Sequence, residues 1–418
     1  MTNSTPVVLF GADSYCALGV ARSLGRLGID IFCIDKTPSA LAMKSRYCTG
    51  RFIWDFASQP RDASVEFLIS VTQKIDRTPL LIAMGDTLNL FVDEHREQLS
   101  GVYVFASPTP GVIARLYNKR TLFELCGAEG IPTPNTLFPH SLNNALSISP
   151  RLRFPLVVKG VDPDRLMRHT GELRMAIAYS REELPAIYQA LDEPAVPNLA
   201  LQEFIKGDAT DNWVVSAYFD RNANCRFAVT GIKLRQLPIQ GGVSSLVACS
   251  PCQPIVDRIC QIAKAAGYHG ALDADFLYDA TDDLYKLLDI NPRLGANFRA
   301  LVDRNGLSAA SAMYLDLTGQ ALPAIEPAWG RRWVVETKDF WALRELLRTK
   351  SISLGEWIDS LKGVSECAYW ASDDIRPALR PYTELCRACL RAATNRLLRR
   401  KKSELPRQAL HRLNQDLR

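Results

Sequence analysis

The chain has 418 residues, 47% of them hydrophobic and 23% charged, which is ordinary for a globular protein and long enough for two or three domains. No apolar run reaches about 18 residues, the first residues lack the pattern of a secretory signal, and the eleven cysteines are odd in number and scattered. We therefore expect no transmembrane helix, no disulfide framework and a cytoplasmic location. The formal net charge of +5 is modest, and it is unevenly distributed.

The chain opens with a strand–helix–strand pattern. Residues 7–10 form an apolar strand, residues 15–27 have helical periodicity, and residues 29–34 form a second strand. This order predicts a parallel sheet, with a ligand at the carboxyl ends of its strands. A nicotinamide dinucleotide is one candidate ligand, but residues 11–15 lack the second glycine that lets the backbone approach a pyrophosphate, so the dinucleotide-binding fingerprint fails.

Two lysines mark the next region. A helix that starts near Gly111 carries Lys119, and a buried strand over residues 154–160 delivers Lys159 near its end. A lysine at a strand end suits contact with phosphate, a solvated strand terminus being the alternative. The polar segment 162–171 predicts a mobile flap that closes over phosphates.

Further strands are expected at residues 199–208, 213–219 and 227–234. At the end of the last strand, Lys233 and Arg235 share one face by alternation. Two cations on one face of a sheet suit an anionic ligand, although a solvated edge strand would have the same pattern.

The strongest chemical signal is a pair of neighbouring strands, residues 271–278 and 284–291, joined by a turn-like acidic segment. They predict an antiparallel hairpin. If its turn is centred near residue 282, Asp275 lies directly opposite Asp289, with Cβ atoms roughly 4.5–5.5 Å apart.

Alternation predicts which side chains accompany this acidic pair. Asp273 shares the face of Asp275, because the two residues are two apart in a strand. In the second strand the same rule places Leu287 and Asn291 on the face of Asp289. Three acids, an amide and one leucine are therefore expected near one another.

Carboxylates this close repel each other unless a cation lies between them. Mg²⁺ prefers oxygen ligands and is usually held by one or two carboxylates, with water and substrate phosphates completing the shell. Asp275, Asp289 and the amide oxygen of Asn291 therefore predict a Mg²⁺ site, which Mn²⁺ can also fill. Arg293 follows, and its planar guanidinium suits phosphate oxygens. A surface hairpin with solvated acids is the alternative.

In this order the features resemble the ATP-grasp superfamily, over roughly residues 1–325. That family has a helical lysine before a Gly-Ile-Pro-x-Pro connection, here Lys119 and residues 130–134. A strand-end lysine that contacts nucleotide phosphates corresponds to Lys159. The Glu-x-Asn-Pro-Arg signature of the family appears as residues 289–293, with aspartate in place of the usual glutamate.

The resemblance implies roles for further residues. A hinge formed by Glu203, Phe204 and Ile205 would hold the adenine of ATP through backbone groups. An acidic residue soon after the hinge, Asp208 or Asp211, would bind the ribose.

The resemblance also implies how phosphate is handled. Lys119 and Lys159 would hold the nucleotide, while Arg293, Arg235 and Lys233 would act as catalytic cations around the transferring group. Because aspartate at position 289 is one methylene shorter than glutamate, the number of metal ions, one or two, stays open.

The implied fold class is α/β, of the α+β ATP-grasp type. It comprises a Rossmann-like pre-ATP-grasp domain, a two-lobed ATP-grasp domain and a C-terminal extension. The expected boundaries are 1–110 for the pre-ATP-grasp domain, 111–195 for the small lobe, 196–325 for the large lobe with the metal site, 326–375 for the extension and 376–418 for a basic tail.

The tail carries the basic charge of the chain. Residues 376–418 contain 12 Lys or Arg and 3 Asp or Glu, a net of +9, so residues 1–375 carry −4. A helix is expected over residues 382–402, ending in four cations at 399–402. This pattern predicts docking to an anionic membrane surface, at the inner face, or to an acidic partner, with a solubilising extension as the alternative. Nucleic acid is not favoured, because interleaved aromatic residues are lacking.

The implied activity is that of a carboxylate-amine ligase, with D-aspartate ligase as the most similar type. Such an enzyme uses ATP and Mg²⁺ to activate a small carboxylate as an acyl phosphate and joins it to an amine, releasing ADP and phosphate. The alternatives are a catalytically silent nucleotide-binding protein that acts by interaction, and a dinucleotide-dependent oxidoreductase. The two substrates and the oligomeric state stay open, a dimer being one option.

Overall fold

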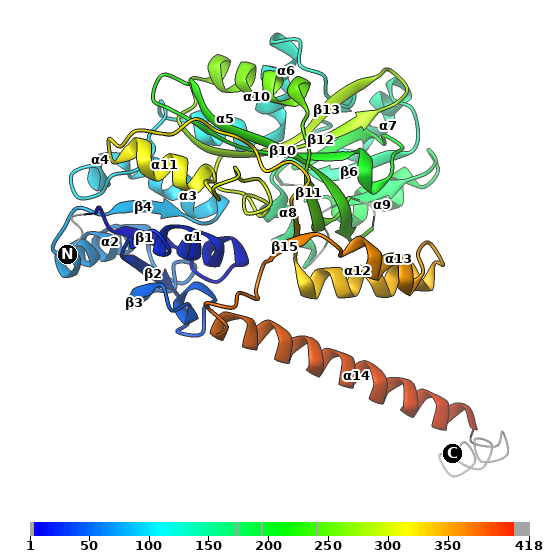
Figure 1. Ribbon diagram of the computed structural model, residues 1–418. Coiled ribbons are helices and arrows are strands. Elements are labelled where there is room, and N and C mark those ends of the chain that lie inside the picture. The colour runs from blue at the N-terminus through cyan, green and yellow to red at the C-terminus, as the bar shows by residue number, and fades with distance from the viewer. Residues whose placement is uncertain (1–3, 172, 174, 194, 240, 405–418) are drawn as a thin grey trace, which may run out of the picture.

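The computed structural model of the protein describes residues 4–404, except for residues 172, 174, 194 and 240 (Figure 1). Within this part, the strands form three sheets of four, seven and four strands. None of the helices described is both long and apolar enough to cross a lipid bilayer. Short 3-10 helices occur at η1 (Ala42–Lys44), η2 (Ser149–Arg151), η3 (Ala209–Asp211) and η4 (Arg376–Ala378).

The N-terminal region is built on a parallel sheet of order β3-β2-β1-β4, which confirms the predicted strand–helix–strand opening. Its central strand β1 is fully buried, and helices cover both faces of the sheet. The elements are β1 (Val7–Phe10), α1 (Tyr15–Gly25), β2 (Ile31–Asp35), β3 (Cys48–Ile53), α2 (Arg61–Ile75), β4 (Leu80–Ala83), α3 (Asp86–Glu94) and α4 (Arg96–Leu99).

The helix expected to carry Lys119 is two helices, α5 (Val112–Tyr117) and α6 (Lys119–Ala128). Asn118 separates them because its side chain accepts hydrogen bonds from the amides of Arg120 and Thr121 and so caps the second helix. Lys119 is therefore the first residue of α6, and its side chain is buried.

The small lobe is an antiparallel sheet of order β5-β8-β6-β7. The segment predicted as a mobile flap is instead a helix, α8, because Asp162 caps it and Arg165 forms a bidentate ion pair with Glu193. The elements are β5 (Thr136–Leu137), α7 (Leu142–Ile148), β6 (Leu156–Gly160), α8 (Pro163–Thr170), β7 (Met175–Ala178), α9 (Leu184–Leu191) and β8 (Leu199–Glu203).

The largest sheet has the order β13-β12-β9-β10-β11-β14-β15. One face packs against α10 and α6, while the opposite face packs against the N-terminal region and α11. Its strands and flanking helices are β9 (Asn212–Phe219), β10 (Cys225–Leu237), β11 (Val243–Cys249), α10 (Gln253–Ala266), β12 (Gly270–Asp279), β13 (Leu284–Asn291), α11 (Ala309–Leu317), β14 (Arg332–Val334), α12 (Glu336–Arg348), α13 (Leu354–Ser360) and β15 (Val364–Cys367).

Residues 326–375, predicted as an extension, contribute β14 and β15 to this sheet and place α12 beside β10 and β11. The extension is thus part of the folded body. The last helix, α14 (Leu379–Glu404), runs away from the body as a single rod (Figure 1). Of the predicted basic tail, residues 405–418 and the side chains of residues 399–402 lie outside the described residues.

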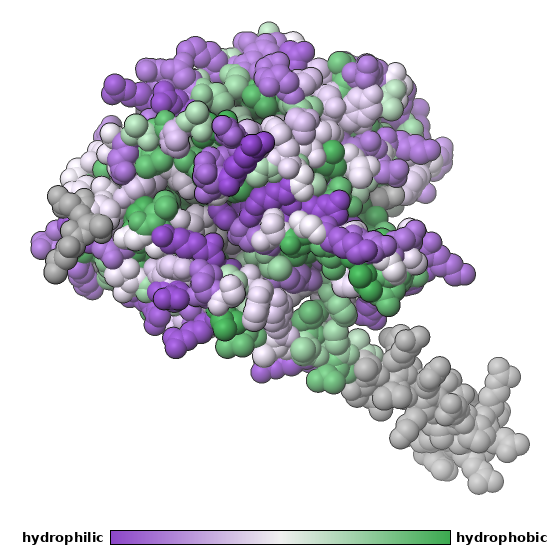
Figure 2. Space-filling model, in the orientation of Figure 1, coloured by the Kyte–Doolittle hydropathy of each residue, from purple (hydrophilic) through white to green (hydrophobic). Residues whose placement is uncertain are grey.

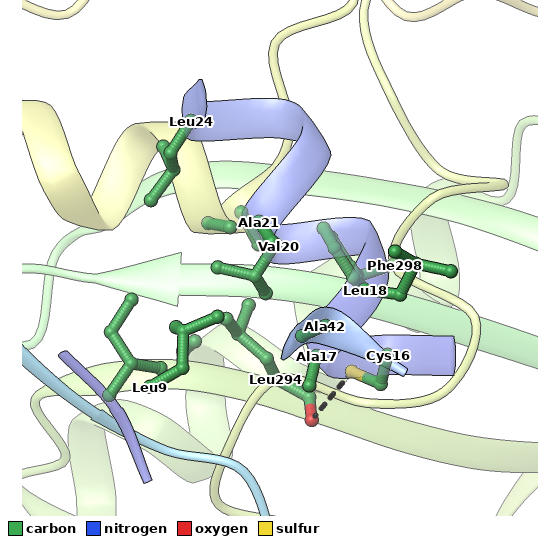
Figure 3. Packing of buried hydrophobic residues seen from close by; sticks show 14 of the residues in the cluster. Leu9, Cys16, Ala17, Leu18, Val20, Ala21, Leu24, Ala42, Leu294 and Phe298 are labelled. Carbon is green, nitrogen blue, oxygen red and sulfur yellow. Dashed lines mark hydrogen bonds between the residues drawn. The ribbon is translucent and has the colours of Figure 1, made fainter. Parts of the chain in front are cut away.

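A continuous core joins the N-terminal region to the large lobe. Helix α1 packs onto the loop that follows β13, and the Cys16 thiol donates to the carbonyl oxygen of Leu294 (Figure 3). It also donates to the carbonyl oxygen of Gly295. A Cβ atom at Gly19 would lie 2.8 Å from the Arg299 side chain, so α1 approaches this loop closely only because glycine is present. The loop after the Asp-x-Asn-Pro-Arg segment is therefore held by the first helix of the chain.

Candidate active site

The predicted antiparallel hairpin is present. Strands β12 and β13 are antiparallel, Asp275 is paired with Asp289, and Asp273 is paired with Asn291. These four polar side chains therefore line one face at the end of the sheet, as the alternation argument predicted for the acids.

A bulge corrects one part of that argument. Between Asp275 and Phe276 the register shifts, so that Phe276 pairs with Leu287 while Leu288 is the extra residue. Leu287 therefore lies with Ile290 in the core on the opposite face, and its predicted place beside Asp289 is wrong. The bulge allows the strand to bury both apolar side chains and still present Asp289 toward Asp275.

Each acid of the central pair contacts a lysine. Lys119 Nζ lies 2.6 Å from Asp289 Oδ1, and Lys233 Nζ lies 2.6 Å from Asp275 Oδ1. Both lysines are buried, so their charges act with little screening by water. The structure thus supplies the positive charge that two neighbouring carboxylates require.

The residues present fit a hard divalent cation. Two carboxylates and the amide of Asn291 offer oxygen atoms on one face, the donor type that Mg²⁺ and Mn²⁺ take. Among the described residues, no group of three or more Asp, Glu, His or Cys side chains is arranged to hold a metal, so substrate and water oxygens would have to complete the shell.

Lys159 is brought to the same place from the small lobe. It is on β6, lies near Lys119 and Asp289, and its ammonium is 5.5 Å from the centre of the Phe123 ring. Burial, and then the charge of Lys119, lower the pKa of Lys159 to about 7, while Asp289 opposes the shift. Two lysines and an acid from three elements thus form a site suited to an anionic group with a cation.

The predicted adenine hinge follows β8. The Glu203 carboxylate accepts hydrogen bonds from Asn135 and Arg153, so this side chain holds the surrounding loops. The amide of Phe204 donates to Pro155, whereas the amide of Ile205 has no partner within the described residues. The backbone at Ile205 is therefore the hinge group available to a ligand.

The two acidic residues that were predicted to bind the ribose stabilise a turn. Asp208 and Asp211 cap the short helix η3 reciprocally, and the amide of Asp208 donates to Asp211 Oδ2 at 2.7 Å. The carboxylate of Asp211 is thus already engaged, whereas Asp208 is exposed.

Arg293 lies at the junction with the N-terminal region. Its guanidinium forms a bidentate ion pair with Asp86, at 2.7 and 2.8 Å, and also donates to Asn291 Oδ1 and to the carbonyl of Leu294. Four of its five N–H groups are thereby engaged. Sequence reasoning missed this partnership, because no local pattern links residues 207 apart.

Arg235 is directed elsewhere. A bulge follows Lys233 in β10, and the Arg235 guanidinium pairs with Asp339 of α12 at 2.8 and 3.1 Å and donates to Ser360. Of the two predicted cations, the structure thus brings Lys233 to the acidic pair but places Arg235 with the C-terminal segment. No signal in the strand itself could reveal a partner on a distant helix.

Asp273 is a further residue whose importance the sequence did not reveal. It is 3% exposed, and its Oδ1 has no hydrogen-bond partner within the described residues. Burial, and then the nearby Asp275, raise the pKa of Asp273 to about 8.

Comparisons with known proteins bear on this geometry. N5-carboxyaminoimidazole synthetase of Staphylococcus aureus, solved with ADP, superposes with a TM-score of 0.62 at 11% identity, covering 83% of this chain and 86% of that one. L-amino acid ligase of Bacillus licheniformis superposes with a TM-score of 0.58 at 14% identity, covering 78% of each chain. The chain has the ATP-grasp fold.

The sequence comparison adds a relative at higher identity. D-aspartate ligase of Enterococcus faecium (strain Aus0004) is 27% identical over 259 residues, which is 60% of this chain. The chain spans about 61% of the length of that ligase. No family model matches the sequence.

Proposed function

We propose that the protein is an ATP- and Mg²⁺-dependent ligase that activates a small carboxylate and joins it to an amine. The observation that carries the proposal is the convergence of Lys119 and Lys159, from two elements, on Asp289 of the acidic hairpin. The ATP-grasp fold and the similarity to D-aspartate ligase support it.

A carboxylate needs activation, because a nucleophile adds negative charge to a group that is already anionic. Transfer of the γ-phosphoryl group of ATP to one carboxylate oxygen gives an acyl phosphate, with ADP as the other product. Attack by the amine nitrogen forms the C–N bond and expels phosphate. Catalysis of phosphoryl transfer is largely positioning and charge neutralisation, which this cation-rich site can supply.

Different residues bind the nucleotide and the metal ion. Lys119 and Lys159 bind phosphate oxygens, and the backbone at Ile205 receives the adenine, with Asp208 near the ribose. Asp275, Asp289 and Asn291 would hold Mg²⁺, which supplies charge neutralisation at the phosphates.

Further cations hold this arrangement together. Arg293 orients the amide of Asn291, and Lys233 holds Asp275. Arg235 supports the C-terminal segment through Asp339. In this proposal Arg293 acts on the phosphoryl group chiefly through Asn291, because most of its N–H groups are engaged.

The test is phosphate release from ATP with Mg²⁺, across pooled carboxylates and amines, with D-aspartate as the first carboxylate. ADP and phosphate should form only when both a carboxylate and an amine are present. AMP formation would overturn the proposal, and Lys159→Ala provides the control that should lose the activity. ATP binding without turnover across a broad panel would instead support a silent nucleotide-binding protein.

We also propose that α14 docks on an anionic membrane surface. Leu379, Tyr382, Cys386 and Leu390 recur at helical spacing along one side, and Figure 2 shows apolar surface at the base of the helix. The net charge of +9 over residues 376–418 makes an anionic surface a better match than a second, equally basic copy.

Co-sedimentation with vesicles tests the docking. The protein should pellet with phosphatidylserine vesicles at low salt and not with phosphatidylcholine vesicles. Deletion of residues 397–418 should abolish this binding and leave turnover intact. Equal sedimentation of the full and shortened chains would contradict the idea.

A further inference from the structure

Asp273 is a buried acid without a partner. It lies two residues from Asp275 on the same face of β12. The charges of Arg293 and Lys233 act on it, but neither forms an ion pair with it in the part of the chain that the structure describes. Asp275, by contrast, has Lys233 at 2.6 Å. An unpaired polar group that is nine-tenths buried costs free energy, so a partner from outside the chain is expected.

The surroundings of Asp273 form a small polar site. Ser216 of β9 is its register partner on the neighbouring strand, is 1% exposed, and its Oγ has no hydrogen-bond partner within the described residues. Tyr15 and Cys16, at the start of α1, lie within electrostatic range of Asp273. Two neighbouring oxygen atoms, one from a carboxyl group and one from a hydroxyl group, are therefore left without donors in the described structure.

Gly295 shapes the same site. A Cβ atom at this position would lie 2.0 Å from Asp273 Cγ, so only glycine allows the loop after β13 to approach the carboxylate. Any side chain would displace Asp273 from its place. The absence of a side chain at residue 295 thus keeps the acid where it is.

The position of Asp273 suits the second substrate. Two residues in a strand span roughly 6.6 Å, so Asp273 is offset by this distance from the predicted metal ligand Asp275. Asp275 pairs with Asp289, which contacts Lys119. Asp273 instead pairs with Asn291, which contacts Arg293. The offset from Asp275 to Asp273 therefore points away from Lys119 and Lys159. A group bound at Asp273 would lie beyond the phosphates, where an attacking amine has to approach.

We propose that Asp273, together with Ser216 Oγ, binds the ammonium form of the amine substrate. An ammonium has three N–H donors, and the site offers a carboxyl oxygen and a hydroxyl oxygen that lack donors. The positive charge of the ammonium favours the ionised form of the Asp273 carboxyl group. This inference rests on the proposed ligase function and specifies which residues recognise one of its substrates. Asp273 is a binding residue here and is not assigned a proton-transfer step.

The experiment measures binding of ethylammonium chloride, a simple cationic amine, by saturation-transfer NMR on the full-length protein without ATP. The Asp273→Asn variant should weaken ethylammonium binding at least tenfold while the affinity for ATP stays within about twofold. Gly295→Ala, which keeps the charge but displaces Asp273, should weaken it as well. Thermal unfolding of both variants confirms that they are folded.

Asp303→Asn is the matched control. Asp303 is 1% exposed and also has one oxygen without a partner in the described structure, but its other oxygen accepts from the amides of Asn305 and Leu307. This variant should bind ethylammonium normally. Equal loss in the control, no loss in Asp273→Asn, or loss of Mn²⁺ binding in place of ethylammonium binding would each overturn the inference.

A separate measurement keeps this inference distinct from the proposed function. Wild-type protein with ATP, Mg²⁺ and D-aspartate should convert neutral hydroxylamine to a hydroxamate, which reports the acyl phosphate. Ethylammonium binding without hydroxamate formation across a carboxylate panel would refute the ligase and leave the cation site standing. Hydroxamate formation without ethylammonium binding would refute the cation site and leave the ligase function standing.

Discussion

Two kinds of ion pair occur at the hairpin and on the nearby strand β10, and they differ in whether their cations are available to a ligand. On the face of the hairpin, Lys119 and Lys233 each make a single contact of 2.6 Å with an aspartate. At its borders, Arg293 forms a bidentate pair with Asp86. A second bidentate pair joins Arg235 of β10 to Asp339 of α12.

This difference separates binding groups from structural ones. A lysine carries a compact charge on a flexible stem and can exchange a carboxylate for a phosphate oxygen. A buried bidentate arginine cannot leave without exposing its partner to an apolar environment as an unpaired charge. We therefore expect the lysine pairs to open when nucleotide and metal bind, while the arginine pairs hold the N-terminal and C-terminal segments in place.

The largest effect is expected at the Arg235 pair. Asp339→Ala would leave Arg235 buried and unpaired and would also remove the acceptor of Ser245 and Trp357. The free energy of unfolding should fall by about 3–5 kcal/mol, the usual result of breaking a buried pair. Denaturant unfolding measures it.

The matched control replaces both members of the pair. The double variant Arg235→Met, Asp339→Leu should recover most of the lost stability, because no buried charge is left unpaired. If Arg235 is structural, this double variant keeps its ligase turnover. Loss of turnover in a fully stable double variant would restore the catalytic role that the sequence predicted for Arg235.

For a lysine pair, a change should lower turnover and have little effect on stability. Asp289→Asn should lower turnover about 100-fold to 1,000-fold, the usual cost of one lost electrostatic contact at a reacting group. It should shift the unfolding midpoint much less than Asp339→Ala does, because Asp289 is 33% exposed and the amide oxygen of asparagine can still accept from Lys119. Steady-state kinetics with ATP and Mg²⁺, beside a thermal melt, measure both. A stability loss as large as that of Asp339→Ala would show that the two kinds of pair do not differ.

A smaller effect is expected from pH. The pKa of Lys159 is lowered to about 7, chiefly by burial, and a bound phosphate would raise it because the anion favours the charged lysine. Below pH 7 Lys159 is charged before and after binding. Above it, binding must take up a proton, so ATP affinity should fall by up to about tenfold per pH unit.

Calorimetry in buffers of different ionisation enthalpy measures this uptake directly. Lys159→Arg, which stays charged throughout, is the control and should show a flat affinity above pH 7. An identical pH dependence in the two proteins would show that another group titrates.

How far the sequence predicts the molecule depends on the range of each interaction. Alternation within one strand, and a turn assumed to be centred near residue 282, were enough to predict the pairing of Asp275 with Asp289. The bulge at Leu288 was not predictable, because it depends on the packing of Leu287 and Ile290 against other elements. Local periodicity thus predicted the correct face for the acids and the wrong face for the neighbouring Leu287.

The charged pairs show the same limit at longer range. Lys119, Lys159 and Lys233 were recognised as cations in suitable places, but their partners were not. Asp86 and Arg293 are 207 residues apart, and no pattern in either segment indicates that they meet. The helix at residues 163–170 escaped prediction because polar composition suggested a flap, whereas an N-cap and one ion pair fold it.

The smallest effect is expected from lengthening Asp289. The Glu-x-Asn-Pro-Arg signature that residues 289–293 resemble has glutamate at this position, and the aspartate here reaches Lys119 with a side chain one methylene shorter. Asp289→Glu should therefore change turnover less than about tenfold, since the charge is kept. Its longer carboxylate can bridge two ions, so turnover of the variant should respond to free Mg²⁺ in excess of ATP, while wild-type turnover saturates with the Mg²⁺–ATP complex. Asp275→Glu, on the facing strand, is the control; an equal response to free Mg²⁺ in both variants would show that position 289 does not set the number of ions.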